Sequence, residues 1–272
     1  MAMEWMPILL ECARNVGRNI APLIRNANKP GLSFGIGAGG DPMRQVDLAA
    51  ERAVVDTLLA HEISFTLISE ESGIMRYGDK PEESYVVVDP IDGTTNLTRG
   101  IPFYATSIAV STKPEMQFVH AALVSDLFHN VTYTAERGCG AHRDGRRIYP
   151  STEDSLDEVV IGVDLNTYKV REIAPRITGL LAKARHIRHL GANSLELCYV
   201  ADGTTDAFID IRGKLRVTDT AAAWLIVNEA GAKITTPTGG PLNARLDPRE
   251  RVTFVAAGNE RLHKIILDHI KA

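Results

Sequence analysis

Hydrophobic residues recur every three or four positions through residues 4–26, and this spacing predicts an amphipathic helix. Residues 26–42 then hold most of the nearby glycine, so we expect a flexible loop there, because glycine loses the most backbone entropy on ordering. Asp41 followed by Pro42 is typical of a helix N-cap and first turn, so a second helix should begin at this pair. Its inward face would carry Leu48, Val54, Val55, Leu58 and Leu59.

Short runs rich in β-branched and aromatic residues follow and predict a group of strands. They span residues 63–69, 84–89, 104–112, 117–125 and 130–136, and an Asp-Gly pair within 142–147 predicts a hairpin turn. After residue 150 the pattern alternates, with strands predicted at 157–163, 184–190, 206–212 and 253–258 and helices from about 169, 193, 218 and 259. Strands first and alternation later predict an α+β lobe over residues 1–150 and an α/β lobe over residues 151–272.

The composition is that of an ordinary soluble globular protein, with 272 residues, 44% of them hydrophobic and 24% charged. The 30 basic and 34 acidic residues give a net charge of −4, which disfavours nucleic acid as a partner because nucleic-acid-binding proteins present a strongly basic face. No apolar run approaches the ~20 residues of a membrane span, and Glu4 stands where a signal peptide carries basic charge. Cys12, Cys139 and Cys198 are scattered and odd in number, so we expect reduced thiols in a cytoplasmic protein. The charge balance leaves a small molecule as the expected partner.

The segment with the clearest chemical signal is YVVVDPIDGTTN, residues 85–96. A buried strand delivers Asp89 at its carboxyl end, where ligands bind in sheet proteins of this class. Pro90 keeps Asp89 extended, and the Asp92-Gly93 step turns the chain so that Asp92 lies beside Asp89. Two carboxylates with the Ile91 carbonyl between them form the all-oxygen set that Mg²⁺ prefers. A structural turn explains the Asp-Pro and Asp-Gly pairs equally well.

Other carboxylates also stand at the ends of predicted elements. Glu70 and Glu71 follow the predicted strand at 63–69, and Asp219 opens the helix predicted from 218. Asp41 and Asp47 flank the start of the second helix. Each of them has an ordinary structural role available, as a solvated loop residue or as a partner of a helix N-terminus. Only their combination points to a shared site.

That combination resembles the inositol monophosphatase superfamily. The residues that carry the resemblance are Glu70-Glu71-Ser72, the run Asp89-Pro-Ile-Asp-Gly-Thr-Thr-Asn96, and Asp219-Thr-Ala-Ala222. Their order and spacing agree with the superfamily over essentially the whole chain. The resemblance implies a five-layer αβαβα sandwich, a Mg²⁺-dependent phosphomonoesterase, a small phosphorylated substrate and a homodimer.

The resemblance also implies a ligand set for two or three Mg²⁺ ions, with Mn²⁺ as a possible substitute. Glu70, Asp89 and the Ile91 carbonyl would bind the first ion. Asp89, Asp92 and Asp219 would bind the second, and a third, weaker ion would lie near Glu70. The two metals would stabilise the attacking and leaving oxygens.

The mechanism implied is in-line attack of an activated water on phosphorus, without a phosphoenzyme. Thr94 and Glu70, supported by Asp47, would orient and deprotonate this water. The amides of Gly93 and Thr94 would bind phosphate oxygens. The glycine-rich loop would act as a lid that brings Asp41 and Asp47 toward the metals.

Departures from the superfamily pattern bear on the substrate. Threonine and tryptophan of the pattern are replaced by Arg44 and Thr218, and a glutamate that contacts substrate hydroxyls is replaced by Arg212. An arginine favours an anion, so Arg212 would bind a distal phosphate, with a surface salt bridge as its alternative role. Arg188 would join it, and the loop Gly191, Ala192 and Asn193 would complete the substrate contacts.

The loop over residues 37–47 is similar to that of the archaeal branch, whose members act on both inositol phosphate and fructose 1,6-bisphosphate. We therefore expect hydrolysis of inositol 1-phosphate, fructose 1,6-bisphosphate or both. The alternative within the superfamily is a phosphatase for 3′-phosphoadenosine 5′-phosphate or another sugar phosphate. An aspartyl-phosphate phosphatase is less favoured, because Asp89 and Asp92 are three residues apart and that class spaces its aspartates by two.

Two further classes of protein are alternatives to a phosphatase. The first is a nicotinamide-dependent oxidoreductase, because Gly35, Gly37 and Gly40 match the dinucleotide-binding G-x-G-x-x-G pattern. This class is disfavoured, because the glycines follow a predicted helix and no βαβ unit surrounds them. The remaining class is a non-enzymatic interaction protein, which Mg²⁺-dependent phosphate release would separate from an enzyme.

Overall fold

The computed structural model describes residues 4–24, 33–36, 38, 42–166 and 169–270. The helices are α1 Trp5–Ile24, α2 Gln45–Ala60, α3 Thr94–Arg99, α4 Val170–Leu181, α5 Asn193–Ala201, α6 Val217–Ala230 and α7 Glu260–His269. The strands are β1 Ser33–Ile36, β2 Pro42–Arg44, β3 Phe65–Ser69, β4 Gly73–Tyr77, β5 Tyr85–Asp92, β6 Ala105–Ser111, β7 Val119–Asp126, β8 Val131–Glu136, β9 Gly140–Arg143, β10 Arg146–Arg147, β11 Val160–Val163, β12 His186–Arg188, β13 Ala207–Arg216, β14 Lys233–Thr235 and β15 Arg251–Ala257. None of these helices combines the length and apolar character needed to cross a membrane.

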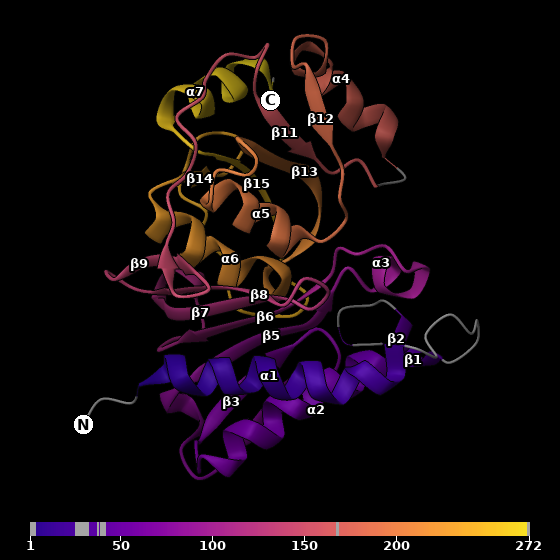
Figure 1. Ribbon diagram of the computed structural model, residues 1–272, viewed down its shortest axis with the longest axis vertical. Helices are drawn as coiled ribbons and strands as arrows, with labels where there is room; N and C mark the ends of the chain where they lie inside the picture. The colour runs from indigo at the N-terminus through magenta and orange to yellow at the C-terminus, as the bar shows by residue number, and fades with distance from the viewer. Residues whose placement is uncertain (1–3, 25–32, 37, 39–41, 167–168, 271–272) are drawn as a thin grey trace.

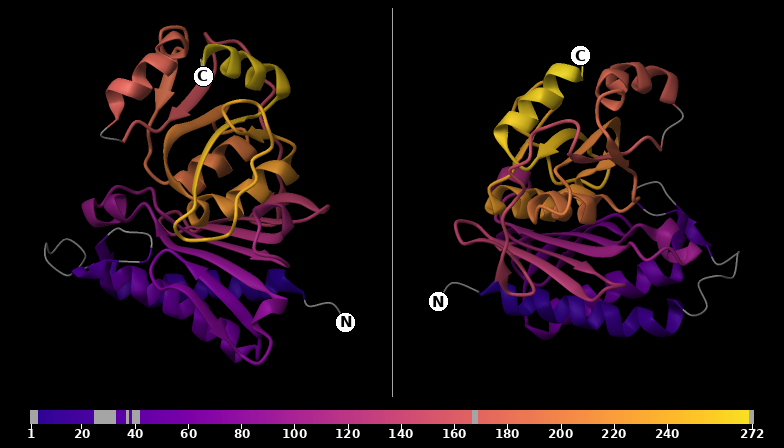
Figure 2. Two further views of the ribbon diagram at one scale, coloured as in Figure 1. Left: turned by 180° about the vertical axis from the view of Figure 1, so that it is seen from behind. Right: turned by 45° about the horizontal axis from the view of Figure 1, so that its top comes forward.

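The elements stack in five layers. In Figure 1, α1 and α2 lie below an eight-stranded sheet, α5 and α6 lie between the two sheets, and α4 and α7 lie above a five-stranded sheet. The two views of Figure 2 show the same order of layers from behind and tilted forward. This order is the αβαβα sandwich that the resemblance implies, so the expected fold is confirmed.

The large sheet has the strand order β10-β9-β8-β7-β6-β5-β3-β4, and the small sheet has the order β12-β11-β13-β15-β14. Strands β3 and β5 are parallel neighbours, with Ser69 opposite Val88. Their carboxyl ends therefore lie at the same edge of the sheet, and this edge receives Glu70 and Asp89. All strands of the large sheet precede residue 150, and all strands of the small sheet follow it.

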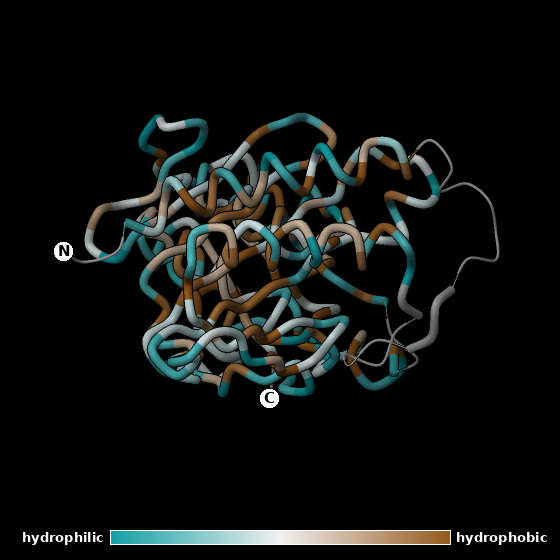
Figure 3. The backbone as a smooth tube through the Cα atoms, turned by 90° about the horizontal axis from the view of Figure 1, so that it is seen from below, coloured by the Kyte–Doolittle hydropathy of each residue, from teal (hydrophilic) through white to brown (hydrophobic). Residues whose placement is uncertain are grey.

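Apolar side chains fill the space between the layers. One cluster packs α1 and α2 on the lower face of the large sheet, and Cys12, Val16 and Val54 lie within it. A second cluster joins the upper face of this sheet to α5 and α6, and a third joins α4 and α7 to the small sheet. Figure 3, viewed from the side of α1 and α2, shows hydrophobic and hydrophilic positions alternating along these helices. Burial of one face therefore holds each helix to its sheet.

Two sequence predictions for the second helix are wrong. The helix begins at Gln45 rather than at Pro42, because Pro42–Arg44 forms a strand that pairs antiparallel with Ser33–Ile36. The first turn is capped by Asp47, whose Oδ2 accepts a 2.9 Å hydrogen bond from the backbone N–H of Arg44. Asp41 itself lies outside the described residues.

Leu59 is the other error on this helix. Val54, Val55 and Leu58 are buried as predicted and Leu48 is partly buried, but Leu59 is 43% exposed. Each residue turns about 100° around a helix, so Leu59 lies beside the apolar face that Leu58 occupies.

Most of the other predicted elements are confirmed within a few residues, whereas β4, α3 and β14 were not predicted. Strand β1 also contradicts the prediction of a loop over residues 26–42, because Ser33–Ile36 pairs with β2. The hairpin predicted at 142–147 is present as β9 and β10, with Asp144 and Gly145 at φ of 49° and 75°. Positive φ at both central residues is what a tight type I′ turn requires.

Candidate metal centre and active site

A β-bulge in β5 sets the geometry of the Asp89–Asp92 segment. Asp89 pairs with Ser107 and Asp92 pairs with Ala105 on β6, so β5 carries one extra residue between these pairs. Thr106 on β6 donates a 2.7 Å hydrogen bond to the carbonyl of Pro90 and fixes the bulge. A bulge bends its strand and redirects the side chains beside it. Both aspartates remain buried, at 2% and 5% exposure.

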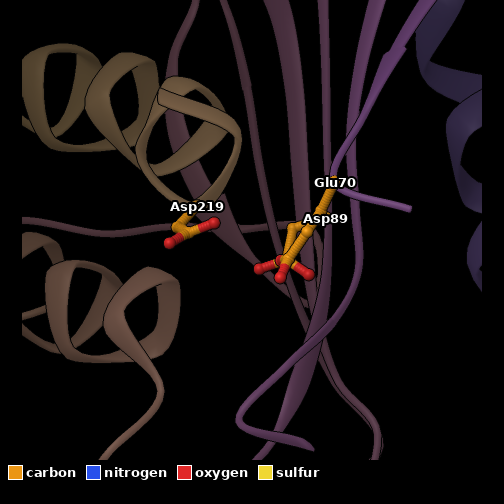
Figure 4. Close-up of side chains that lie close together, drawn as sticks. All are labelled: Glu70, Asp89 and Asp219. Carbon is orange, nitrogen blue, oxygen red and sulfur yellow. The ribbon is translucent and has the colours of Figure 1, made fainter. Parts of the chain in front are cut away.

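Three carboxylates from three elements meet next to this bulge. Glu70 follows β3, Asp89 lies in β5 and Asp219 lies in the first turn of α6. One oxygen atom from each lies within 4.8 Å of the others. Figure 4 shows the carboxylates of Glu70 and Asp89 side by side at the strand ends, with that of Asp219 facing them from the helix.

The electrostatics of this cluster favour a cation. Burial raises the pKa of Asp89 well above its usual value, and the charges of Glu70 and Asp219 raise it further. Within the described part of the chain, Oδ1 of Asp89 is buried and has no hydrogen-bond partner. A buried carboxylate oxygen without a partner is costly, and a bound cation removes that cost. The three carboxylates with the nearby Ile91 carbonyl are hard oxygen donors, so the residues present fit Mg²⁺ or Mn²⁺.

Asp92 lies outside this group of three, and its carboxylate faces the N-terminus of α5. Its Oδ1 accepts a 3.1 Å hydrogen bond from the N–H of Asn193, and its Oδ2 accepts a 2.7 Å bond from the N–H of Ser194. The hydroxyl of Ser194 also donates to Oδ2. Burial, followed by the charge of Asp219, raises the pKa of Asp92 to about 7. Asp92 therefore adjoins the cluster through Asp219 while it holds α5 in place.

The side chains of Thr94 and Asp47 lie close together. The hydroxyl of Thr94 is 2.9 Å from the Ile91 carbonyl and 3.4 Å from Oδ1 of Asp47. This hydroxyl has one proton, so the shorter contact to Ile91 is the main hydrogen bond in this structure. Burial raises the pKa of Asp47 to about 6. Asp47 is the nearest carboxylate able to accept the proton of Thr94.

The turn after β5 requires glycine and packs on the loop before α5. Gly93 has φ of 87°, and a Cβ there would lie 3.0 Å from the Phe103 carbonyl and 3.1 Å from Cβ of Ala192. Asn96 donates a 2.7 Å hydrogen bond to the Leu190 carbonyl. The predicted substrate residues Gly191, Ala192 and Asn193 therefore adjoin Asp92 and Gly93.

The two arginines predicted to bind a distal phosphate have different surroundings. Arg212 has a side chain only 6% exposed and forms ion pairs with both Asp164 and Asp210. Its Nη1 also donates a 3.1 Å hydrogen bond to the Asn166 carbonyl. Arg188 is exposed at the end of β12, where its Nη1 donates a 2.9 Å hydrogen bond to the carbonyl of Ile187. Arg188 is therefore freer to meet an anion than Arg212.

Sequence reasoning missed three residues that support the cluster. Arg216 caps α6 and pairs with Glu70, with Nη1 3.0 Å from Oε1. Glu51 on α2 accepts hydrogen bonds from Ser69 and, at 3.2 Å, from the N–H of Ser72, and so holds the turn that carries Glu70. Ser194 on α5 is the third, and both its N–H and its hydroxyl donate hydrogen bonds to Oδ2 of Asp92.

Two of these residues had a signal in the sequence. The spacing Arg-x-x-Asp occurs at both Arg44–Asp47 and Arg216–Asp219, and it marks the start of a helix each time. Glu51 lies four residues after Asp47, which places both on one face of α2.

Comparison with known proteins gives a consistent result. The model of the inositol monophosphatase family matches residues 6–272. A protein of Methanothermobacter thermautotrophicus named fructose-1,6-bisphosphatase/inositol-1-monophosphatase is 35% identical, over 98% of this chain and 96% of its own. The bifunctional NADP phosphatase/NAD kinase of Methanococcus maripaludis is 33% identical, over 96% of this chain and 48% of its own. A crystal structure described as an inositol monophosphatase-fructose 1,6 bisphosphatase superposes with a TM-score of 0.85 at 30% identity, covering 98% of this chain and all of the other.

Proposed function

This chain belongs to the inositol monophosphatase family, and we propose that it is a Mg²⁺-dependent phosphatase that hydrolyses inositol 1-phosphate, fructose 1,6-bisphosphate or both. The observation that carries the proposal is the meeting of Glu70, Asp89 and Asp219, with one buried oxygen of Asp89 left without a partner among the described residues. Carboxylates buried this close together repel one another, and a divalent cation held among them beside a phosphate would offset that repulsion.

We assign the metal ligands as the family resemblance implies. Glu70, Asp89 and the Ile91 carbonyl would hold one ion, Asp89, Asp92 and Asp219 would hold a second, and a third, weaker ion would lie near Glu70. Asp92 accepts three hydrogen bonds from α5, and a carboxylate has about four acceptor sites, so it retains one for a metal. When bound, the ions neutralise phosphate charge and increase the acidity of a coordinated water. Mg²⁺ is the proposed ion, and Mn²⁺ has the same preference for oxygen.

The residues of the chain position the attacking water and its proton. Thr94 presents its hydroxyl to the Ile91 carbonyl and Asp47, and Glu70 is one of the three carboxylates of the cluster. A water held between Thr94 and Glu70 would donate one hydrogen bond to each of them. Glu70 would accept the single proton that this water loses as it attacks, and Asp47 would accept a hydrogen bond from the hydroxyl of Thr94. Attack in line with the leaving oxygen then needs only this positioning and the neutralised charge. Asp41, which lies outside the described residues, remains the proposed lid residue.

The substrate contacts are assigned to the α5 side of the site. The amides of Gly93 and Thr94 face the phosphate, and the loop of Gly191, Ala192 and Asn193 faces the leaving group. In this structure Oδ1 of Asn193 is buried and has no partner among the described residues, so it is available to a substrate hydroxyl. Arg188 is the preferred ligand for a distal phosphate. Arg212 would contact a distal phosphate only through guanidinium N–H groups that are not engaged by Asp164 and Asp210.

A second substrate has a specific observation in its favour. The chain aligns with about half the length of a bifunctional NADP phosphatase/NAD kinase, and NADP carries a phosphate monoester on its ribose.

Phosphate release from inositol 1-phosphate, fructose 1,6-bisphosphate, NADP and 3′-phosphoadenosine 5′-phosphate, with Mg²⁺ or EDTA, tests the proposal. We expect turnover of at least one of the first two that requires Mg²⁺ and is lost in Asp89→Asn. A phosphoenzyme trapped on Asp89 would contradict it.

We also propose a cytoplasmic homodimer. The free thiols of Cys12 and Cys198, both buried, agree with a reducing compartment. Ile101 and Phe128 are large apolar side chains with 46% and 55% exposure, and burial against a second copy would remove them from water. Light scattering of the purified protein tests the dimer.

A further inference from the structure

Arg216 places a positive charge beside the carboxylate cluster, in contact with Glu70. It is the last residue of β13 and the N-cap of α6, and its backbone N–H donates a 3.3 Å hydrogen bond to Oδ2 of Asp219. Its side chain reaches Glu70, with Nη1 3.0 Å from Oε1. The side chains of Arg216 and Glu70 are only 12% and 16% exposed, so solvent screens this pair little.

The charge of Arg216 acts on the whole cluster. Burial raises the pKa of Asp219, and among the effects that oppose this rise the guanidinium of Arg216 is the largest. The same guanidinium opposes the rise in the pKa of Asp89 that burial, Glu70 and Asp219 produce. Arg216 therefore offsets the mutual repulsion of three carboxylates that come from separate elements.

A cation in this place has two opposite effects on metal binding. It orients Glu70, which would favour a metal, and it repels an incoming divalent ion, which would oppose one. Coulomb repulsion between charges a few ångströms apart in a poorly screened site exceeds the entropy cost of ordering one carboxylate. The repulsion should therefore outweigh the ordering of Glu70, so that Arg216 lowers the affinity of the cluster for Mg²⁺.

We propose that Arg216 is a positioning residue that serves as a resident counter-ion, stabilising the metal-free cluster and weakening its affinity for Mg²⁺. The inference rests on the proposed metal centre and deepens it, since Arg216 would set the Mg²⁺ concentration at which the enzyme becomes active. A merely structural role predicts the opposite sign, because loss of the contact would loosen Glu70 and weaken Mg²⁺ binding.

The test is calorimetric titration with Mg²⁺, together with thermal unfolding in EDTA, for the wild type, Arg216→Gln and Arg216→Lys. Arg44→Gln is the matched control, because Arg44 caps α2 in the same way and its N–H is bonded to Asp47. We expect Arg216→Gln to bind Mg²⁺ at least about fivefold more tightly and to unfold at a lower temperature in EDTA. Arg216→Lys and Arg44→Gln should bind Mg²⁺ within about twofold of the wild type.

Equal or weaker Mg²⁺ binding by Arg216→Gln would overturn the counter-ion role while leaving the metal centre intact. If Arg216→Gln does not fold without metal, Arg216→Lys decides, and a tenfold change in its affinity would overturn the proposal. A wild type that binds no Mg²⁺ would reject the metal centre itself, and the inference with it.

Discussion

The backbone N–H of Ser194 donates a 2.7 Å hydrogen bond to Oδ2 of Asp92, across 102 positions of the chain. The contact joins the bulged end of β5 to the first turn of α5, so it ties the candidate metal centre to the loop assigned to the substrate. A carboxylate at this end of a helix satisfies N–H groups that lack partners within the helix. Asp92 is therefore both a structural cap and a candidate ligand.

Replacing Asp92 by Asn separates these two roles only in part. The variant removes the negative charge of a metal ligand. Its side-chain NH₂ is also a hydrogen-bond donor, and it would face N–H groups that now donate to the carboxylate. We expect a loss of about a thousandfold or more in turnover and a stability loss of about 1–3 kcal/mol. Phosphate-release kinetics and urea unfolding measure the two effects. Near-normal turnover would remove Asp92 from the second metal site.

Thr94→Val keeps the shape of the side chain and removes its hydroxyl. We expect kcat to fall by about 10²–10⁴-fold, because the water loses the group that orients it, while KM and Mg²⁺ affinity change little. Thr94→Ser, which keeps the hydroxyl, is the matched control and should retain most of the activity. Equal kcat values for the Val and Ser variants would exclude the hydroxyl from the reaction.

Replacing Arg188 should alter catalysis, whereas replacing Arg212 should alter stability. Arg188→Ala should lower kcat/KM for fructose 1,6-bisphosphate about tenfold, while kcat/KM for inositol 1-phosphate stays within about twofold. Arg212→Ala should instead destabilise the fold by about 3–5 kcal/mol, because it leaves Asp164 and Asp210 as unpaired buried charges. A selective loss on the bisphosphate in Arg212→Ala, with unchanged stability, would return the distal phosphate to Arg212.

Stability without metal should fall as pH rises. Burial raises the pKa of Glu196 to about 7, although the N–H groups of Gly191 and Leu190 partly oppose the shift. The folded state therefore binds this proton more tightly than the unfolded state does. Its contribution is fully present below the unfolded pKa of about 4.3 and is lost as pH rises through about 7.

Urea unfolding in EDTA at several pH values measures this dependence. The protein should be less stable at about pH 8 than at about pH 5.5, and Glu196→Gln should show a shallower slope. A stability that is flat or rises over this range would contradict the assignment.

The residues of the cluster could be predicted because they stand in local motifs. The Asp89–Asn96 run, the glutamate after β3 and the aspartate in the first turn of α6 are each set by a strand end or a helix start, and such signals are short-range. The fold followed from the same motifs through the resemblance.

What the sequence could not predict depends on tertiary contacts or on competing local signals. The ion pair of Arg216 with Glu70 joins the end of β13 in the small sheet to the turn after β3 in the large sheet, and no local motif encodes that contact. The start of α2 was misplaced because Asp41-Pro42 carries the sequence signal of a helix start. Pro42–Arg44 instead pairs as a strand, and Asp47 accepts the hydrogen bond from the N–H of Arg44. Strand β4 escaped notice because Ile74 and Met75 are 50% and 45% exposed and show no alternation of apolar and polar residues.

The most direct test of the metal centre is anomalous diffraction from a crystal of the protein soaked in Mn²⁺. We predict an anomalous peak with carboxylate oxygens of Glu70, Asp89 and Asp219 at about 2.0–2.3 Å from it, and no such peak in Asp89→Asn. A fully occupied Mn²⁺ peak elsewhere, with these three carboxylates free of metal, would contradict the account.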